Sequence, residues 1–326
     1  MIGIVLAAGL GTRLRPYSQV ISKAAMPVAG VPIVLRVIEQ LRAAGVKGRF
    51  IVIARSPEHD IVPLIVEHAR RNDYEVSFGY QDEQRGSAHA LMQVPESERL
   101  DQDVLIGACD NLYEADELRR LVAQHTERQT DGACRADGTL AVLRVPPEKM
   151  TASSNVVVDG ERVTRVVEKP RVNQIASPFA GPCLYAFSPR ILGYLDAVTE
   201  SPRGELEFQD AMQAFIADGA RVGWFELSRR VTLTTPDDLL ALNETFFAEM
   251  PAGTRSISGS TIAEPCVIDA DVQIGQGSTV GPNTHLMRGC RVGQGCTVRH
   301  ALVLPGAVVP DGATVEHTLV APGTQS

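Results

Sequence analysis

The chain has 326 residues, of which 44% are hydrophobic, and a formal net charge of −8 at pH 7. This length provides enough apolar material for a large core and a second, smaller domain. Mild acidity with scattered basic residues excludes a nucleic-acid-binding surface, and neither an apolar run long enough to span a membrane nor a signal peptide is found, which together predict a cytoplasmic protein.

The first predicted strand, Ile2–Leu6, is a short apolar run that leads into a loop containing Gly9 and Gly11. Because these residues have no Cβ, backbone N–H groups can approach a ligand closely. Concave arrays of backbone N–H groups bind anions. The loop is therefore predicted to bind an anion.

Positive charge follows the glycines at Arg13, Arg15 and Lys23, and no Asp or Glu occurs before Glu39. The dinucleotide-binding fingerprint needs a third glycine where this chain has Leu14, and the Walker loop needs Gly-Lys-Ser/Thr at the start of a helix. Neither motif fits, although a purely structural turn after a strand could also contain two glycines. Glycines, arginines and a lysine in this order favour a polyphosphate site.

The segment from Leu6 to Pro16, with Lys23 and the later Met-Pro-Val, resembles the sugar-1-phosphate nucleotidyltransferases, a superfamily that includes glucose-1-phosphate thymidylyltransferases and N-acetylglucosamine-1-phosphate uridylyltransferases. The resemblance extends over residues 1–250 and implies catalytic roles for Arg13 and Lys23. It also implies that the nucleotide is bound by loop residues Leu6, Ala8, Gly9, Gly11 and Thr12. The family usually has proline before the lysine, so Ser22 predicts a slightly less rigid loop.

Strands and helices are expected to alternate from residue 1 to about residue 250. The expected strands are Ile2–Leu6, Phe50–Ala54, Glu75–Tyr80 and Val104–Ala108, and the expected helices are Ile33–Ala44, Ile61–Arg70, Ser87–Val94 and Glu117–Arg128. This alternation predicts a Rossmann-like α/β domain with a mixed, mainly parallel sheet and helices on both faces. Ligands of such sheets bind at the carboxyl ends of the strands, where the motifs are found.

The third expected strand leads into a loop containing Gln81, Gly86 and Ser87. A glutamine offers a donor and an acceptor together, as the imide edge of uracil or thymine requires, and a glycine lets backbone groups approach the base. Uridylyl- and thymidylyltransferases have a glutamine followed five residues later by a glycine, so the resemblance implies that this loop binds the nucleotide, UTP or dTTP. The alternative is a loop in which Ser87 is a helix N-cap.

Asp110 follows the fourth expected strand. A carboxylate in this position must be paired, used as a cap or bound to a metal, because an isolated buried carboxylate is costly. Mg²⁺ needs few protein carboxylates when phosphate oxygens complete its coordination. From the residues alone a helix cap fits equally well; the resemblance implies that Asp110 binds Mg²⁺ and that Asn111 lies close to the sugar.

Glu168, Lys169 and Pro170 match the family's Glu-Lys-Pro. The resemblance implies that the glutamate contacts sugar hydroxyls and that the lysine binds the sugar phosphate. Pro170 removes an N–H and is expected to hold Lys169 in an extended backbone conformation. Where the family commonly has Tyr-Gly, this chain has Ser154 and Asn155, so Asn155 is predicted to lie at the sugar and an unusual sugar is expected.

The position of a second metal ligand stays open. Related enzymes carry Asp or Asn shortly before Thr-Pro-x-Asp-Leu-Leu, a motif that begins here at Thr235 and predicts a helix start. Gapless alignment with the family places Thr232 at the metal position. Counting from Trp224 instead places Glu226 there, so both residues are candidates.

After Pro251 a six-residue period begins, which predicts a separate domain over residues 251–326. Aliphatic residues recur at Ile262, Ile268, Ile274, Val280, Leu286, Val292, Val298 and Leu304. A small or modest side chain precedes each by two positions: Ser260, Cys266, Val272, Ser278, Thr284, Cys290, Cys296 and Leu302. This period is typical of a left-handed parallel β-helix, here of roughly three coils.

The repeat places three of the chain's cysteines inside the predicted coil. The six cysteines, at positions 109, 134, 183, 266, 290 and 296, show no Cys-x-x-Cys spacing and no nearby histidine ligands, so reduced structural thiols are predicted. A coil with an open end and flat faces predicts a homo-oligomer. Hexapeptide domains also occur in acyltransferases, for which His285, His300 and His317 would be candidate bases.

The predicted reaction is transfer of a nucleotidyl group from UTP or dTTP to a sugar-1-phosphate, or to a sugar-like cyclitol phosphate, with release of pyrophosphate and Mg²⁺ as cofactor. Because a sugar-1-phosphate is already an anionic nucleophile, alignment and electrostatics suffice for catalysis. Two alternatives stay open. One is a non-catalytic regulatory subunit that binds a nucleotide sugar, and the other is a bifunctional enzyme with acyltransferase activity in the repeat.

Overall fold

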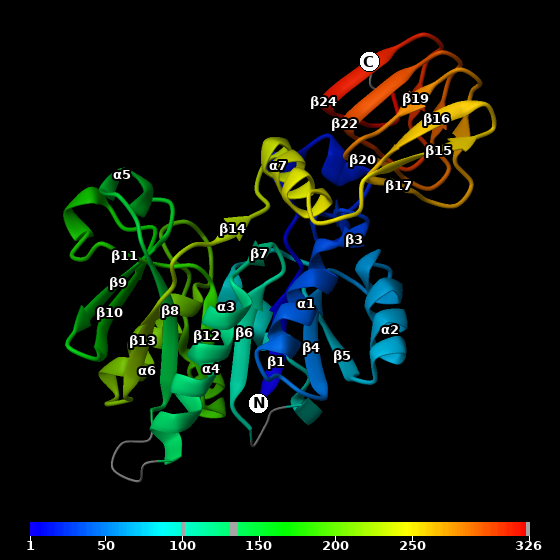
Figure 1. Ribbon diagram of the computed structural model, residues 1–326. Coiled ribbons are helices and arrows are strands. Elements are labelled where there is room, and N and C mark those ends of the chain that lie inside the picture. The colour runs from blue at the N-terminus through cyan, green and yellow to red at the C-terminus, as the bar shows by residue number, and fades with distance from the viewer. Residues whose placement is uncertain (99–101, 131–135, 324–326) are drawn as a thin grey trace. The chain divides into compact units, whose positions relative to one another are not determined.

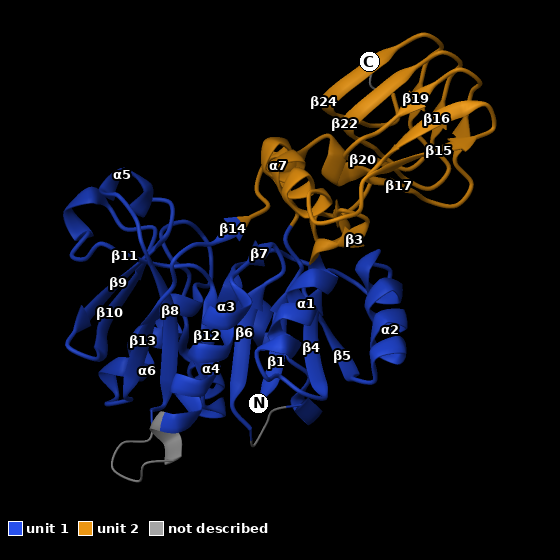
Figure 2. Ribbon diagram, in the orientation of Figure 1, with its two compact units in different colours: residues 1–9, 34–231 blue, residues 10–33, 232–326 orange. Residues whose placement is uncertain are grey.

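The computed structural model describes residues 1–98, 102–130 and 136–323, so Cys134 lies outside the described residues. The chain divides into two compact units (Figure 2). The first unit comprises residues 1–9 and 34–231, and the second comprises residues 10–33 and 232–326. The domain boundary predicted near residue 250 thus falls within the second unit, which also contains the cationic segment 10–33.

A ten-stranded sheet forms the centre of the first unit (Figure 1). Its strands are β1 (Ile2–Leu6), β4 (Arg49–Ala54), β5 (Glu75–Tyr80), β6 (Val104–Ala108), β8 (Gly138–Arg144), β9 (Ser154–Asp159), β10 (Arg162–Glu168), β11 (Phe179–Gly181), β12 (Leu184–Phe187) and β13 (Val222–Glu226). They are ordered β10-β9-β11-β8-β12-β6-β1-β4-β5, with β13 paired to β8. Strands β6, β1, β4 and β5 are mutually parallel, and β12 is antiparallel to both of its neighbours. The predicted mixed α/β sheet is confirmed.

Four helices of this part of the chain agree closely with those expected: α1 (Ile33–Ala43), α2 (Ile61–Asn72), α3 (Ser87–Met92) and α4 (Ala115–Thr130). Two further helices, α5 (Pro147–Met150) and α6 (Phe208–Ala217), were not predicted. Alternate residues of β1, Ile2 and Ile4, join one buried cluster with Phe208 and Phe215 of α6, as the two-residue period of a strand requires. Among the described helices, none is long and apolar enough to cross a membrane.

Short strands pair in parallel throughout the C-terminal part of the second unit. They are β15 (Gly253–Ile257), β16 (Ser260–Glu264), β17 (Cys266–Ile268), β18 (Gln273–Ile274), β19 (Thr279–Val280), β20 (Thr284–Leu286), β21 (Arg291–Val292), β22 (Thr297–Val303), β23 (Val308–Val309) and β24 (Thr314–Val320). Thr261 pairs with Thr279, 18 residues later, whereas Thr297 pairs with Thr314, 17 residues later. Only the terminal β15 is antiparallel to its described neighbour.

The interior of this repeat follows the six-residue period up to Val298 and then shifts by one residue. Ala301 and Val303 belong to the interior cluster, which also contains Cys266, Cys290 and Cys296. The interior positions predicted for Leu302 and Leu304 are wrong, because one turn of the repeat is a residue shorter and His285 pairs with Leu302. Leu304 consequently lies in a separate cluster.

Residues 10–33 fold against the repeat, which the sequence did not predict. Tyr17 and Ile21 pack on Met287, Leu304 and Ala321, which follow one another at 17-residue intervals along the repeat. Residues 10–33 also contain two short strands of the second unit, β2 (Pro27–Val28) and β3 (Val31–Pro32). The segment that carries Arg13 and Lys23 is therefore built on the C-terminal part of the chain.

Helix α7 (Pro236–Phe247) also belongs to the second unit. It starts as predicted, with Thr235 as N-cap, and the Thr235 and Asp238 side chains cap each other's backbone N–H groups. Asn243, which is buried, accepts a hydrogen bond of 2.8 Å from the Ala29 N–H and donates one of 3.0 Å to the Pro27 carbonyl. Asn243 therefore links α7 to the cationic segment.

We expect Asn243→Ala to lower the free energy of unfolding by about 3 kcal/mol, because it leaves a buried N–H and a buried carbonyl without partners. Thr245→Ala on the same helix is a suitable control, since this exposed hydroxyl donates to the Ala241 carbonyl of its own helix. Urea denaturation followed by circular dichroism compares the two variants. Equal unfolding midpoints for both would contradict the role assigned to Asn243.

Candidate functional site

The loops after β1, β5 and β6 lie at one edge of the sheet in the first unit, because these strands run parallel. Gln84 joins two of the loops: its Nε2 donates to the carbonyl of Ala8, at 3.4 Å, and to that of Gln81, at 3.2 Å. The Cys109 N–H donates to the Leu6 carbonyl at 3.1 Å. The predicted site residues of the first unit that follow these strands, Ala8, Gly9, Gln81 and Asp110, are thus brought to the same edge.

Gln81 is held in one orientation by its own loop. The side chain is only 4% exposed, and its Nε2 donates to the Gly86 carbonyl at 3.0 Å and lies 3.1 Å from His89 Nδ1. Among the described residues, its side-chain hydrogen bonds are all made through Nε2. Its Oε1 is therefore suited to accept a hydrogen bond from a ligand N–H.

Gly86 occupies a position that a larger residue could not adopt. Its φ is 108°, and an added Cβ would lie 2.4 Å from the Leu206 carbonyl oxygen. Gly86 is also the N-cap of α3, so the N-cap predicted at Ser87 is wrong. The Ser87 hydroxyl instead accepts a hydrogen bond of 3.0 Å from Phe208 N–H, the first residue of α6.

The cationic segment of the second unit is organised around Gly11. This residue has a φ of 60°, and an added Cβ would lie 2.9 Å from the Cβ of Lys23. The Ser18 hydroxyl donates to the Gly11 carbonyl at 2.8 Å. Buried Leu14 anchors the single helical turn that carries exposed Arg13. Gly11 is thus needed both for its backbone conformation and for the close approach of Lys23.

Ser22, which replaces the proline usual in the family, has a defined structural role. The residue is buried, and its hydroxyl accepts a hydrogen bond of 3.3 Å from Ala25 N–H. It is thereby the N-cap of the 3-10 turn Lys23–Ala25. The Ser22 side chain thus stabilises the turn at Lys23–Ala25, at the position where the family has the rigid ring of proline.

Asp110 is half-buried immediately after β6. Burial and the neighbouring negative charge of Asp110 raise the pKa of the Cys183 thiol to about 12. Asn111, the next residue, is buried and donates to the Pro182 carbonyl at 2.9 Å. A carboxylate here offers the hard oxygen donors that Mg²⁺ prefers.

Lys169 differs from the extended conformation expected before a proline. Its φ is 43°, in the left-handed region, so that prediction is wrong. The Lys169 N–H donates to the Ser153 carbonyl at 3.1 Å, and Nζ forms an ion pair of 3.4 Å with Glu205. Left-handed conformations of residues other than glycine concentrate at functional sites, where surrounding contacts hold them.

Glu168 and Lys169 line a cavity of about 760 Å³ in the first unit. Burial raises the pKa of the Glu168 carboxyl, which accepts a hydrogen bond from the Ser154 hydroxyl. Arg203 lines the same cavity and donates to the Glu168 carbonyl oxygen at 3.4 Å and to Glu207 at 2.8 Å. Arg203 was missed by the sequence analysis, since nothing in its spacing connects it to Glu168.

Asn155 has a structural role that the sequence did not predict. The side chain is fully buried; its Nδ2 donates to the carbonyls of Ser177, at 2.9 Å, and Phe179, at 3.1 Å. Its Oδ1 accepts from Ala176 N–H at 3.0 Å. The amide therefore fixes the loop before β11 rather than offering a polar group to a sugar, which corrects the expectation for this residue.

Glu226 and Thr232, the alternatives for a second metal ligand, occupy different surroundings. Strands β12 and β8 separate β13, which ends at Glu226, from β6, so the backbones at Glu226 and Asp110 are about 14 Å apart by strand spacing. The Glu226 carboxylate pairs with Arg144 at 3.3 Å. This geometry argues against one ion shared by Glu226 and Asp110. Thr232 belongs to the second unit, and its hydroxyl lies 3.5 Å from that of Thr234.

Comparison with known proteins gives consistent matches over both parts of the chain. A family model described as nucleotidyl transferase matches residues 2–243, and one described as the GMPPB C-terminal domain matches residues 262–325. A glucose-1-phosphate thymidylyltransferase from Streptomyces griseus is 30% identical over 332 residues, covering 95% of this chain and 88% of that protein. The UTP–glucose-1-phosphate uridylyltransferase AglF from Haloferax volcanii is 29% identical, covering 73% of this chain and 93% of that protein. The UTP-bound UGPase from Acinetobacter baumannii has a similar fold, with a TM-score of 0.63 and 19% identity over 77% of this chain and 94% of that one.

Proposed function

The chain belongs to the nucleotidyl transferase family, within the sugar-1-phosphate nucleotidyltransferase superfamily, and from this premise we propose that it transfers a nucleotidyl group from UTP or dTTP to a sugar-1-phosphate or a cyclitol phosphate. The attacking phosphate oxygen forms a bond to the α-phosphorus, and pyrophosphate leaves. The observation that carries this proposal is the close contact between the Lys23 side chain and Gly11, next to the helical turn that carries Arg13. Such a cationic glycine loop matches a triphosphate.

In this proposal the loop residues bind the nucleotide and stabilise the charge that develops during transfer. Backbone groups from Leu6, Ala8, Gly9, Gly11 and Thr12 contact the nucleotide, together with the Ser87 region at the start of α3. Arg13 stabilises charge on the α-phosphoryl and pyrophosphate oxygens, and Lys23 neutralises the same region. Electrostatic stabilisation of this kind is a large part of phosphoryl-transfer catalysis.

Members of this superfamily generally use a divalent metal, and we propose Mg²⁺ held by Asp110. The half-buried carboxylate after β6 fits this ion because phosphate oxygens can complete its coordination. When bound, Mg²⁺ would neutralise phosphate charge and help to orient the reactants. Of the two alternatives for a second ligand, the sheet order argues against Glu226.

The acceptor is proposed to bind at the cavity lined by Glu168, Lys169 and Arg203. Glu168 would contact sugar hydroxyls, and Lys169 would exchange its ion pair with Glu205 for the acceptor phosphate. Arg203 adds a second cation at the same cavity. Asn111 is the further candidate for a sugar contact. In this proposal Lys169 and Arg203 bind the acceptor phosphate through their positive charges.

Gln81 is proposed to select the base, and Gln81→Ala is expected to raise the KM for UTP or dTTP about tenfold, because one hydrogen bond from the base N–H is lost. The control is Gln93→Ala, which removes another amide that bonds to His89. Steady-state kinetics with each nucleotide provide the comparison. An unchanged KM in Gln81→Ala would remove Gln81 from base recognition.

A grid of nucleoside triphosphates and sugar-1-phosphates, assayed for pyrophosphate release, tests the proposed function. UTP or dTTP should be turned over, and CTP should not, because its N3 is an acceptor that faces the Gln81 acceptor. Guanine also offers an N–H, so GTP belongs in the grid. Binding of a nucleotide sugar without turnover for any pair would support the regulatory-subunit alternative instead.

For the C-terminal repeat we propose a left-handed β-helix that mediates homo-oligomer assembly. Parallel pairing at intervals of 18 and 17 residues supports this winding. Of the three candidate bases for the bifunctional alternative, His285 is only 2% exposed and lies 3.0 Å from Asp269, whereas His300 and His317 are more accessible and face Glu244. Acetyl-CoA consumption measured in parallel with the grid tests the acyltransferase alternative.

A further inference from the structure

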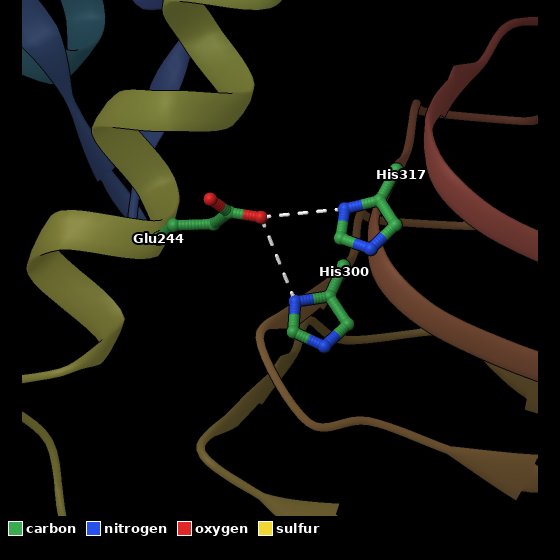
Figure 3. A group of neighbouring side chains, drawn as sticks. All are labelled: Glu244, His300 and His317. Carbon is green, nitrogen blue, oxygen red and sulfur yellow. Dashed lines mark ion pairs between the residues drawn. The ribbon is translucent and has the colours of Figure 1, made fainter.

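Three side chains of the second unit converge outside the proposed catalytic residues (Figure 3). Glu244 lies on α7, His300 on β22 and His317 on β24. Glu244 Oε1 lies 3.6 Å from Nδ1 of His300 and 3.4 Å from Nδ1 of His317. One ligand atom from each residue lies within 4.8 Å of the other two. The group therefore joins α7 to two neighbouring strands of the repeat.

The backbone at both histidines is in the left-handed region, with φ of 49° and 48°. Asn283, 17 residues before His300, has the same conformation with a φ of 53°, and its Nδ2 lies 3.3 Å from His300 Nδ1. This bend of the repeat suits asparagine or glycine better than other residues. Two histidines in the left-handed conformation at successive bends are unusual, and unusual backbone conformations of this kind cluster at functional sites.

The group offers a cation one carboxylate oxygen and two imidazole nitrogens. A neutral imidazole carries one proton, and when that proton is on Nε2 the Nδ1 atom is an acceptor. At His300 this tautomer matches the neighbouring amide donor, since Asn283 Nδ2 lies 3.3 Å from Nδ1. With the same tautomer at His317, the carboxylate oxygen and both Nδ1 atoms direct lone pairs at one another, and a divalent cation between them would be bound by all three.

We propose that Glu244, His300 and His317 form a binding site for a divalent transition metal of the Zn²⁺ type. Tetrahedral Zn²⁺ places its nitrogen and oxygen ligands about 3.4 Å apart, close to the observed separations of 3.4 Å and 3.6 Å. The stacked rings need only rotate to direct both nitrogens at one ion, and both are at least partly exposed. Two imidazoles and one carboxylate suit Zn²⁺, Co²⁺ or Ni²⁺ better than Mg²⁺.

A metal at this site would fasten α7 to the repeat. Glu244 is adjacent to Asn243, which bonds to Pro27 and Ala29 of the segment that carries Arg13 and Lys23. Because the ligands come from separate elements, the folded chain should bind the ion better than the unfolded chain. Zn²⁺ is then expected to raise the unfolding temperature. The metal site does not depend on the proposed transferase activity.

Equilibrium dialysis of the full chain against Zn²⁺, after removal of metals with a chelator, tests the site. We expect one Zn²⁺ per chain, binding that persists in Asp110→Asn, and an affinity about 100-fold weaker in Glu244→Gln and in His317→Asn. Asparagine is chosen because Asn283 already tolerates the left-handed conformation. Glu249→Gln is the matched control, since Glu249 is exposed just beyond α7.

The unfolding temperature should rise with Zn²⁺ in the unmodified chain and in Glu249→Gln, and not in the two ligand variants. The proposal is overturned if Zn²⁺ shows no saturable binding, or if binding is unchanged in Glu244→Gln. Should His317→Asn fail to fold, Glu244→Gln still decides the question, because its exposed carboxylate is replaced by an amide of equal size. Neither result depends on turnover of any nucleotide.

Discussion

Arg13→Ala is expected to reduce kcat by about a thousandfold or more, because it removes a guanidinium that stabilises charge on the phosphoryl group being transferred. The side chain is exposed, so the folded structure should be unaffected and the unfolding temperature unchanged. Pyrophosphate release at saturating substrates measures the effect. Arg13→Lys should recover only part of the activity, since an ammonium cannot replace the planar fork of guanidinium donors.

The matched control is Arg15→Ala, which removes an exposed arginine two residues away on the same loop. A general effect of positive charge on nucleotide attraction would affect both variants similarly and would disappear at high salt. The specific role assigned to Arg13 requires a much larger, salt-independent loss in Arg13→Ala. Near-normal turnover in that variant would refute the catalytic assignment.

The parallel part of the sheet and its loops could be predicted because their signals are local. Apolar runs such as Ile2–Leu6 fix the strands, and parallel strands bring their carboxyl ends to one edge. The positions of Gln81 and Asp110 at that edge follow from this rule. Gly11 was recognisable for a similar reason, since a left-handed turn and a close approach both require glycine.

The features that were missed depend on contacts between residues far apart in the sequence. Nothing near Tyr17 indicates that it packs against Met287 and Leu304. The one-residue shift in the repeat is visible only from the pairing of His285 with Leu302. The fold class and the first parallel strands can therefore be read from local pattern, whereas the partners of individual segments depend on how separate parts of the chain pack.

The same distinction explains the errors at the acceptor cavity. A proline disfavours helical and left-handed conformations in the residue before it, yet Lys169 is held at a φ of 43° while its N–H bonds to Ser153. Asn155 was predicted to contact the sugar because it occupies the position where the family commonly has glycine. In the structure its amide is satisfied by the loop at residues 176–179 instead. If the acceptor binds as proposed, sugar selection is expected to depend on residues that line the cavity, Arg203 among them.

Asp110→Asn is expected to lower kcat about a thousandfold, because an amide cannot supply the negative oxygen that holds Mg²⁺ and several kcal/mol of charge stabilisation are lost with it. The substitution preserves the size of the side chain, so the protein should still fold. Asp116→Asn, an exposed acid on α4, is the control and should leave activity unchanged. Chelation with EDTA should abolish turnover in the unmodified chain, and added Mg²⁺ should restore it.

The dependence of rate on Mg²⁺ separates metal binding from a merely structural role for Asp110. If Asp110 holds the ion, Asp110→Asn needs a higher Mg²⁺ concentration for half-maximal rate, whereas a residue that only caps a loop would change stability and leave this concentration unaltered. An unchanged Mg²⁺ requirement together with near-normal kcat would contradict the assignment.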